Sequence, residues 1–166
     1  ALDLRHIVSA ATDLDSFQAR AVFSQLIDGI EPALTTEPTL KLPGARHPLL
    51  IPAIRNRATE QPQETHTARS ELEPVPVNIE ITPPTNVLIV TGPNTGGKTV
   101  ALKTAGLLVL MAQSGLHIPT DPQAVVGLFK SVFADIGDEQ SISNSLSTFS
   151  GHITRILEMD RNLTLP

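Results

Sequence analysis

The sequence predicts an α/β domain, and the prediction depends on three features that follow one another in the chain. Residues 87–90 form an apolar, β-branched run, which is typical of a buried strand. A glycine-rich turn follows at residues 92–97. Residues 100–113 are then almost continuously apolar, which predicts a helix that is buried on most sides and capped at its C-terminal end by Gly115.

A second helix is predicted near the start of the chain. Thr12 or Asp13 can cap its first turn, because a short side-chain oxygen accepts hydrogen bonds from the free N–H groups there. Gly29 and Pro32 end it. Its apolar residues recur at the spacing of one helix face: Leu14, Phe17, Ala21, Val22 and Leu26. This pattern predicts an amphipathic helix that packs on another element.

The middle of the chain is expected to be extended and irregular, because ten of the 14 prolines fall between residues 32 and 84. Residues 40–42 and 49–51 are short apolar pieces between prolines. Residues from 55 to about 74 are polar and charged, which predicts a surface loop. Residues 75–81 alternate between apolar and polar side chains, which predicts a strand.

One more strand and one more helix are predicted towards the end of the chain. The strand is expected at residues 131–136, and the helix from Ser145 or Ser147 to about Asn162. The apolar face of this helix consists of Phe149, Ile153, Ile156, Leu157 and Met159.

The composition excludes several classes of protein. Lys and Arg number 12 against 17 Asp and Glu, so the net charge of −5 argues against a basic surface that coats nucleic acid. The chain has no Cys, which excludes disulfide scaffolds and thiol catalysis. No apolar run approaches the roughly 18 residues that a membrane helix needs, and the N-terminus does not resemble a signal peptide. A cytoplasmic protein without a membrane partner is expected.

Residues 92–99 read GPNTGGKT and fit the phosphate-binding pattern G-x-x-x-x-G-K-[ST]. Glycines let backbone N–H groups approach phosphate oxygens, and the following helix directs its positive end at the anion. Lys98 would set its ammonium against the β- and γ-phosphates, and the Thr99 hydroxyl can bind Mg²⁺. The sequence therefore predicts a site for ATP and Mg²⁺ that consists of Gly92, Pro93, Asn94, Thr95, Gly96, Gly97, Lys98 and Thr99.

A nucleotide hydrolase also needs a carboxylate that completes the metal site and orients the attacking water. The apolar stretch 132–135 ends in Asp135, but no helix-starting turn follows it. Asp135 is therefore a weak candidate for this carboxylate, and it can equally be the polar end of a strand. On this interpretation the chain binds nucleotide and turns it over little or not at all.

Four segments together resemble the ATPase domain of the MutS family, an ABC-type branch of the P-loop ATPases. The first is the P-loop itself, which contains Asn94 and is preceded by VLIVT. Residues 45–50 (ARHPLL) resemble the family's arginine–histidine–proline segment, residues 135–141 (DIGDEQS) its Q-loop, and residues 146–149 (LSTF) its S-T-F signature. Thr95, the Thr-Val pair after Lys98 and the DEQS and LSTFSGHI strings resemble the branch that suppresses homologous recombination. That branch usually bears a C-terminal Smr nuclease domain.

The resemblance covers about residues 12–160 and implies an incomplete ABC-type P-loop ATPase domain. Residues 1–34 would be the end of a helical connector, and residues 35–166 the N-terminal part of the ATPase domain. The family's acidic strand and histidine loop are expected after residue 166. The chain is therefore expected to be either a piece of a larger protein or a truncated gene product, without the family's nuclease and DNA-binding domains.

The resemblance also implies roles for single residues. Gln140 would lie in the Q-loop, where it can also bind Mg²⁺. Ser147 would be the signature serine, which reaches the nucleotide of the opposite subunit in a homodimer. The adenine would lie near Val75 and the segment that contains His47, although a histidine at this position can equally be structural.

The leading interpretation is the ATP-binding module of a MutS-like ATPase. In the full protein, it would couple ATP binding and hydrolysis to recognition of mismatched or branched DNA and to suppression of homologous recombination. A second interpretation is a catalytically silent nucleotide-binding or dimerisation module, because no convincing second acidic motif is present. A third, a small-molecule kinase, needs an Arg-rich lid, yet only Lys103 and Lys130 lie between the P-loop and Arg155.

Overall fold

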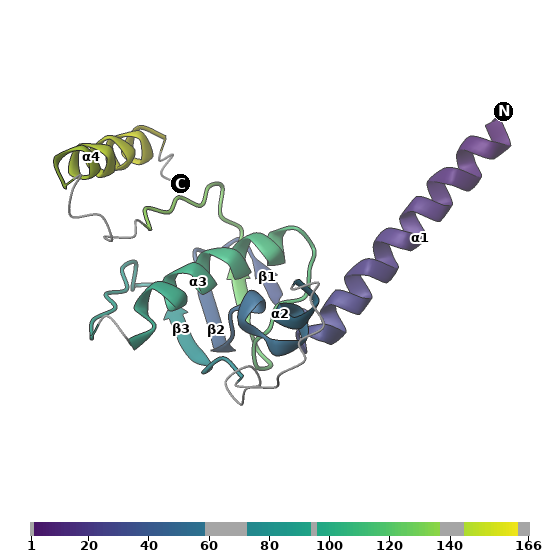
Figure 1. Cartoon of the computed structure of the whole chain (residues 1–166), viewed down its shortest axis with the longest axis horizontal. Coiled ribbons are helices and arrows are strands. Elements are labelled where there is room, and N and C mark those ends of the chain that lie inside the picture. The colour runs from purple at the N-terminus through teal and green to yellow at the C-terminus, as the bar shows by residue number, and fades with distance from the viewer. Residues whose placement is uncertain (1, 59–72, 94–95, 137–144, 163–166) are drawn as a thin grey trace. The chain divides into compact units, whose positions relative to one another are not determined.

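The computed structural model of the chain describes residues 2–58, 73–93, 96–136 and 145–162. The chain divides into two units, Ala1–Leu128 and Phe129–Pro166. Among the described residues, the first unit contains a four-stranded sheet, three α-helices and a short 3₁₀ helix, and the second contains one helix (Figure 1). These elements confirm the predicted mixture of α and β structure.

The sheet is mixed, with the strand order β1-β4-β2-β3. β1 (Ala33–Thr35) pairs in parallel with β4 (Val125–Gly127). β2 (Leu40–Ala45) is antiparallel to β4 on one side and to β3 (Val77–Ile81) on the other. β2 therefore lies in the interior of the sheet, which agrees with the burial of Leu40, Leu42 and Ala45.

β3 confirms most of the strand that alternation predicts for residues 75–81. Ile79 is buried while its neighbours Asn78 and Glu80 are exposed, as expected for a strand with one covered face. β1 and β4 were not predicted, because each has three residues and is too short to show a period.

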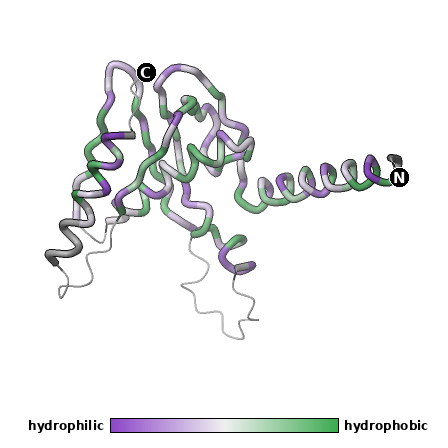
Figure 2. The backbone as a smooth tube through the Cα atoms, turned by 90° about the horizontal axis from the view of Figure 1, so that it is seen from above, coloured by the Kyte–Doolittle hydropathy of each residue, from purple (hydrophilic) through white to green (hydrophobic). Residues whose placement is uncertain are grey.

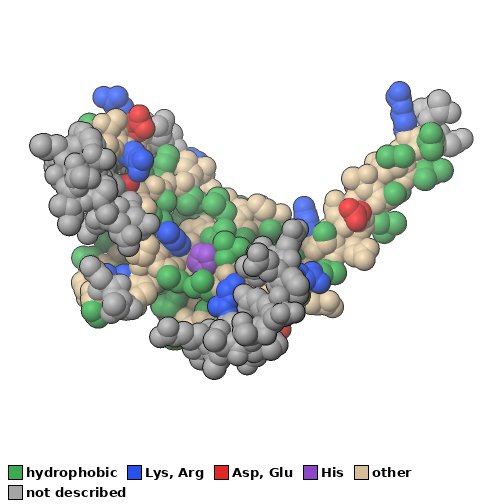
Figure 3. All heavy atoms as spheres, in the orientation of Figure 1, with side chains coloured by type: hydrophobic (Ala, Val, Ile, Leu, Met, Phe, Trp, Pro, Cys, Tyr) green, Lys and Arg blue, Asp and Glu red, His purple; other side chains and the backbone are tan. Residues whose placement is uncertain are grey.

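The central helix α3 (Lys98–Gln113) lies across one face of the sheet (Figure 1). Its buried residues recur at helical spacing and form one face: Thr104, Leu108, Val109, Met111 and Ala112. Val100, Leu102 and Leu110 are exposed, so α3 is buried on one side and not on most sides, as its hydrophobicity predicted. The reason is that α3 packs on a single layer. Within the first unit this outer face stays exposed, and hydrophobic side chains gather over α3 (Figure 3).

The C-terminal end of α3 confirms the predicted glycine cap. Gly115 has φ +73°, its N–H donates to the carbonyl of Ala112 at 3.0 Å, and the N–H of Leu116 donates to that of Met111 at 3.0 Å. These two bonds form a Schellman motif, which needs a residue in the left-handed region after the helix. Gly115 meets that need without the steric cost of a Cβ.

The first helix, α1 (Leu2–Leu26), begins well before the start that was predicted at Thr12 or Asp13. Thr12 lies inside the helix and donates from Oγ1 to the carbonyl of Val8 at 2.9 Å, so neither Thr12 nor Asp13 caps its start. The prediction was wrong because no helix breaker separates these residues from the start of the chain. Leu4, Ile7 and Val8 continue the apolar spacing, and hydrophobic and hydrophilic residues alternate along the whole helix (Figure 2).

Two predicted strands do not form among the described residues. Residues 87–90 and 131–136 carry no helix or strand. Val87 is 72% and Ile89 79% exposed. β-branched residues favour an extended backbone, but a strand forms only where a neighbour accepts and donates its backbone hydrogen bonds. No described strand pairs with either segment.

Residues 48–58 are more helical than predicted. The 3₁₀ helix η1 (Pro48–Leu50) takes up most of the apolar piece at 49–51. Helix α2 (Pro52–Ala58) includes residues 55–58, which were expected to begin the polar loop. Both helices start at a proline, whose fixed φ favours the first helical position. Residues 59–72 of the predicted loop lie outside the described residues.

In the second unit, α4 (Ser145–Asn162) confirms the last predicted helix. Ile153, Ile156 and Leu157 of its apolar face are 41–51% exposed. None of the helices in the described part of the chain has the length and hydropathy of a membrane span.

Candidate nucleotide-binding site

A pocket of about 380 Å³ lies at the first turns of α3, which falls within the size range of small-molecule sites. Its walls come from four parts of the first unit: the end of β2 with η1, the segment that leads into β3, residues 90–91 before the motif, and the start of α3 with the two glycines before it. The lining residues are Ala45, His47, Leu50, Pro74, Val75, Pro76, Val77, Val90, Thr91, Gly96, Gly97, Lys98, Val100, Ala101 and Thr104.

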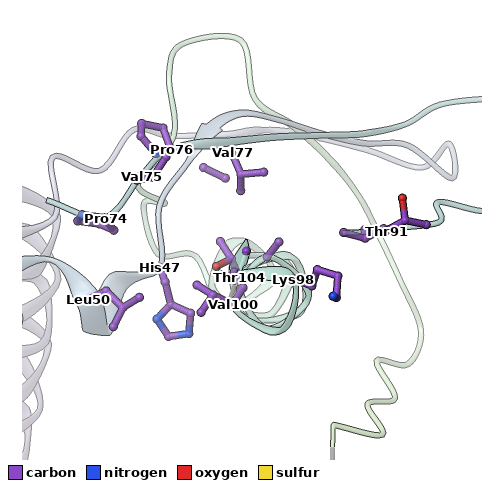
Figure 4. A pocket seen from close by; sticks show the side chains of 15 residues that line it. His47, Leu50, Pro74, Val75, Pro76, Val77, Thr91, Lys98, Val100 and Thr104 are labelled. Carbon is purple, nitrogen blue, oxygen red and sulfur yellow. Dashed lines mark hydrogen bonds between the residues drawn. The ribbon is translucent and has the colours of Figure 1, made fainter. Parts of the chain in front are cut away.

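The pocket has an apolar side and a cationic side (Figure 4). In a view along α3, His47 and Leu50 lie on one side of the helix, and Lys98 lies on the other, towards Thr91. Residues 74–77 lie across the top of the view. A ligand in this pocket would therefore meet apolar surface at one end and an ammonium at the other.

Two of the three motif glycines adopt backbone conformations that other residues rarely take. Gly92 has φ +141° and Gly97 has φ +77°. A Cβ added at either position would meet no other atom within 4 Å. The requirement for glycine is therefore conformational, and the space beside both residues is open to a ligand.

The N-terminal end of α3 is suited to an anion. Its N-cap is Gly97, which has no side chain to accept from the free N–H groups of the first turn, and no acidic residue lies in that turn. The helix dipole adds partial positive charge at the same end. Backbone groups alone thus offer several donors and a favourable potential for phosphate oxygens.

The Lys98 side chain lies back across the phosphate-binding motif. Its Nζ donates a hydrogen bond to the carbonyl oxygen of Gly92, so the ammonium lies over the loop. Thr99 follows in the first turn of α3 and is exposed. The pocket lining contains no Asp or Glu, and the described residues include no cluster of three His, Asp or Glu that could hold a metal ion.

His47 has the most perturbed environment among the pocket residues. Burial, and then the positive charge of Lys103, lower the pKa of its imidazole below the usual range. Its Nδ1 is buried and has no hydrogen-bond partner among the described residues. A neutral imidazole with an unused ring nitrogen therefore lines the apolar side of the pocket.

The pocket brings together five of the residues that the sequence singled out: His47, Val75, Gly96, Gly97 and Lys98. Gly92, Pro93 and Thr99 lie outside its lining. Asn94, Thr95 and Gln140 lie outside the described residues, and Ser147 belongs to α4 in the second unit.

Several lining residues were missed at the sequence level. Val100 lies four residues after Gly96, and Thr104 lies four residues after Val100. Residues at this spacing share one face of a helix, so helix geometry could have predicted that both line the pocket beside the motif. Leu50 and Pro74 join the pocket only because η1 and the segment before β3 fold against α3, and no local pattern shows this.

Asp135, the weak candidate for a catalytic carboxylate, has a cationic partner in its own unit. Its Oδ1 lies 3.4 Å from Nη1 of Arg155, and the Asp135 side chain is only 18% exposed. This contact engages the Asp135 carboxylate within its own unit. This observation favours the interpretation in which it does not bind metal.

Comparison with known proteins identifies relatives over almost the whole chain. Residues 88–164 match the family described as MutS domain V. The chain is 45% identical over 160 residues to the endonuclease MutS2 of Lactobacillus acidophilus, 46% over 154 residues to that of Halothermothrix orenii, and 48% over 152 residues to that of Pelotomaculum thermopropionicum. These matches cover 92–96% of this chain but only 17–18% of the relatives' own length.

Proposed function

The chain belongs to the MutS family, and from this premise we propose that it is the ATP-binding module of a DNA-binding ATPase of that family. One observation carries the proposal: GPNTGGKT stands at the start of α3, beside a pocket large enough for part of a nucleotide. Domain V is the family's P-loop ATPase domain, so the match and the local geometry support the same ligand.

The triphosphate would bind at the N-terminal end of α3. The N–H groups of the first turn would donate to phosphate oxygens, and the positive end of the helix dipole would offset the anionic charge of the phosphates. The Lys98 ammonium, which contacts the Gly92 carbonyl in the structure, would turn to a phosphate oxygen when the nucleotide binds. This charge-assisted contact is of the strong kind, because the acceptor is ionised.

The adenine would occupy the apolar side of the pocket, against Val75 and His47. The unused Nδ1 of His47 supports this placement, because a buried polar atom usually has a hydrogen-bond partner. A base nitrogen or exocyclic amine would provide one. The lowered pKa keeps the imidazole neutral near pH 7, so it could donate or accept according to its tautomer.

Mg²⁺ would be held mainly by the nucleotide. Mg²⁺ commonly takes one or two protein ligands and completes its octahedron with phosphate oxygens and water. The Thr99 hydroxyl, one residue after Lys98, fits this pattern. Gln140 is proposed as a further ligand through its resemblance to the Q-loop. The bound ion would neutralise phosphate charge, while Lys98 and the helix end hold the phosphates in place.

For the full-length protein we propose an ABC-type ATPase domain that works as a homodimer, in which Ser147 contacts the nucleotide of the partner. The curated relatives are endonucleases by name. DNA binding, recognition of mismatched or branched DNA, suppression of recombination and any nuclease activity would belong to the whole protein, of which this chain corresponds to about a sixth.

A catalytically silent nucleotide-binding module is the second candidate. The specific observation in its favour is that the described pocket lining contains no carboxylate to orient water. Both candidates require ATP to bind, and they differ in turnover.

Calorimetric titration of the chain with Mg²⁺ and ATP tests the proposal. Lys98→Ala should weaken ATP binding by about 10- to 100-fold, since a hydrogen bond to a charged group contributes roughly 1.5–3 kcal/mol. Lys41→Ala is the matched control, because it removes the same charge from β2 outside the pocket. Equal affinities for the Lys98→Ala protein and the unmodified chain would remove the P-loop from the proposal.

A further inference from the structure

The apolar side of the pocket offers few backbone groups that could distinguish one base from another. Residues 74–77 form one of its walls, and Pro74 and Pro76 have no N–H group. Val77 begins β3 and pairs there with Ala45. Val75 therefore has the one backbone N–H of this wall that precedes the sheet. Strong selection of one base needs polar groups that the wrong base leaves unpaired, and this segment supplies few of them.

One polar side chain of the pocket lining is placed to contact a base. Among the described residues, the lining contains four polar side chains: His47, Thr91, Lys98 and Thr104. Lys98 lies on the opposite side of α3 from His47, towards Thr91 (Figure 4). Thr104 is buried, and its Oγ1 donates to the carbonyl of Val100 at 2.7 Å. This leaves His47 as the side chain on the apolar side whose polar atoms can pair with a base.

The imidazole of His47 is not used by the fold. His47 is the N-cap of η1 but forms no side-chain hydrogen bond there, and its Nδ1 has no partner among the described residues. A neutral imidazole has one donor and one acceptor nitrogen, and its partners determine which nitrogen carries the proton. His47 can therefore present a donor to one ligand and an acceptor to another.

A fixed positive charge acts on the same imidazole. Burial lowers the pKa of His47 first, and the charge of Lys103 lowers this pKa further. Lys103 is exposed on α3, one residue before Thr104 of the lining. The elements around this side of the pocket, β2, η1, α2 and α3, contain no Asp or Glu. The local potential is therefore positive, which favours a base edge that carries acceptors.

We propose that His47 and Lys103 recognise the edge of the base, and that the pocket accepts guanine as well as adenine. Adenine presents an amino donor at position 6 and guanine an acceptor oxygen, while both have the acceptor N7. The two tautomers of His47 suit the two groups at position 6, and the charge of Lys103 favours the guanine oxygen. Neither base leaves the imidazole unpaired, so discrimination between them is weak. The ligand class is then purine nucleoside triphosphates, and this inference rests on the proposed function, since the phosphates must be held at the start of α3.

Calorimetric titrations of the chain with ATP, GTP and inorganic triphosphate, each with Mg²⁺, test the inference. The expected result is that the affinities for ATP and GTP agree within about threefold and that both exceed the affinity for triphosphate. ATP binding with GTP more than about thirtyfold weaker overturns the inference and leaves the proposed function intact. Triphosphate that binds as tightly as both nucleotides also overturns it, because the base is then not recognised. Failure of all three ligands to bind contradicts the proposed function itself.

Variants of His47 separate recognition from packing. His47→Phe keeps an aromatic ring without nitrogens and should weaken ATP and GTP by about two- to tenfold each, the value of one hydrogen bond. His47→Gln again offers a donor and an acceptor and should recover part of this loss for both nucleotides. Circular dichroism checks that each variant is folded. Unchanged affinities in His47→Phe would remove His47 from base recognition.

A variant of Lys103 tests the effect of charge on the choice of base. Lys103→Gln should lower the affinity for GTP relative to ATP by about two- to fivefold, because it removes an exposed charge that favours the guanine oxygen. Lys41→Gln is the matched control, since it removes the same charge from β2 outside the pocket lining and should leave the ratio unchanged. An equal ratio in the Lys103→Gln protein and the unmodified chain would contradict the role of Lys103.

Discussion

His47 shows how much of a residue's chemistry depends on contacts that the sequence does not reveal. The sequence left its role open between structure and nucleotide contact. The structure places it on η1's N-terminal side, half-buried beside Lys103, with one ring nitrogen unpaired. Lys98 is the opposite case, because its position in the motif specified its location at the start of α3. Motif residues were predictable because their geometry is local, whereas the surroundings of His47 come from distant segments.

The stability of the folded chain should depend on pH through His47. Its folded pKa is lowered, while the unfolded residue titrates near pH 6.5. As pH falls through about 6.5, the unfolded state takes up the proton first, so the free energy of unfolding decreases until the folded pKa is passed. Thermal unfolding at about pH 7.5 and about pH 5.5 should therefore show a smaller decrease for His47→Asn than for the unmodified chain. His6→Asn, on the exposed part of α1, should keep the full decrease. Identical decreases in all three proteins would contradict this assignment.

At the level of elements, helices were predicted better than strands. A nearly continuous apolar run with a glycine cap located α3, and the helical spacing of an apolar face located α4. The strand expected at residues 87–90 does not form because strand pairing depends on a partner elsewhere in the chain, and none of the described strands lies beside it. Helix α2 was missed because the polar residues from Arg55 on suggested a loop. The informative signal was the proline at the first position of the helix.

The glycine cap of α3 leads to a prediction about how a single element affects the stability of the chain. Gly115→Ala places a Cβ in the left-handed region, which costs roughly 1–2 kcal/mol. For a chain of this length the unfolding midpoint should fall by about 2–8 °C. The nearest atom to the added Cβ would be Nη1 of Arg20 at 3.5 Å, so backbone strain and not a clash is the cause. Gly115→Asn is the comparison, because Asn tolerates this conformation and should lose less stability. An Asn variant that is no more stable than the Ala variant would argue against this cause.

For the molecule as a whole, the sequence predicted the family, the mixed α/β composition and the position of the motif in front of α3. It did not predict the β1-β4-β2-β3 order, and of the pocket walls it offered Val75 and the segment of His47, through the family resemblance, but not Leu50 or Pro74. Both depend on contacts between segments that are far apart in the chain. Motif recognition gave the phosphate side of the candidate site and the resemblance suggested Val75 and His47 for its other side, while the folded structure added Leu50 and Pro74.

The chain as a whole should bind ATP without efficient hydrolysis. No Asp or Glu lines the pocket in the described part of the chain, and Asp135 pairs with Arg155. A phosphate-release assay with Mg²⁺ and ATP should therefore give a rate close to that of Lys98→Ala, which controls for contaminating activity. Asp135→Asn should leave this rate unchanged. Rapid turnover that disappears in Asp135→Asn would identify Asp135 as the missing carboxylate.

The central claim is that ATP binds with its phosphates at the start of α3. Amide hydrogen exchange measured peptide by peptide, with and without saturating ATP and Mg²⁺, tests this most directly, because it locates the bound ligand on the chain. The account predicts slower exchange at the amides of residues 97–101 and, on the apolar side, at the non-proline residues of 45–50 and at Val75 and Val77. The Lys98→Ala protein should lose this protection at the same ATP concentration. Unchanged exchange at residues 97–101 while ATP is bound, or protection confined to other segments, would contradict the account.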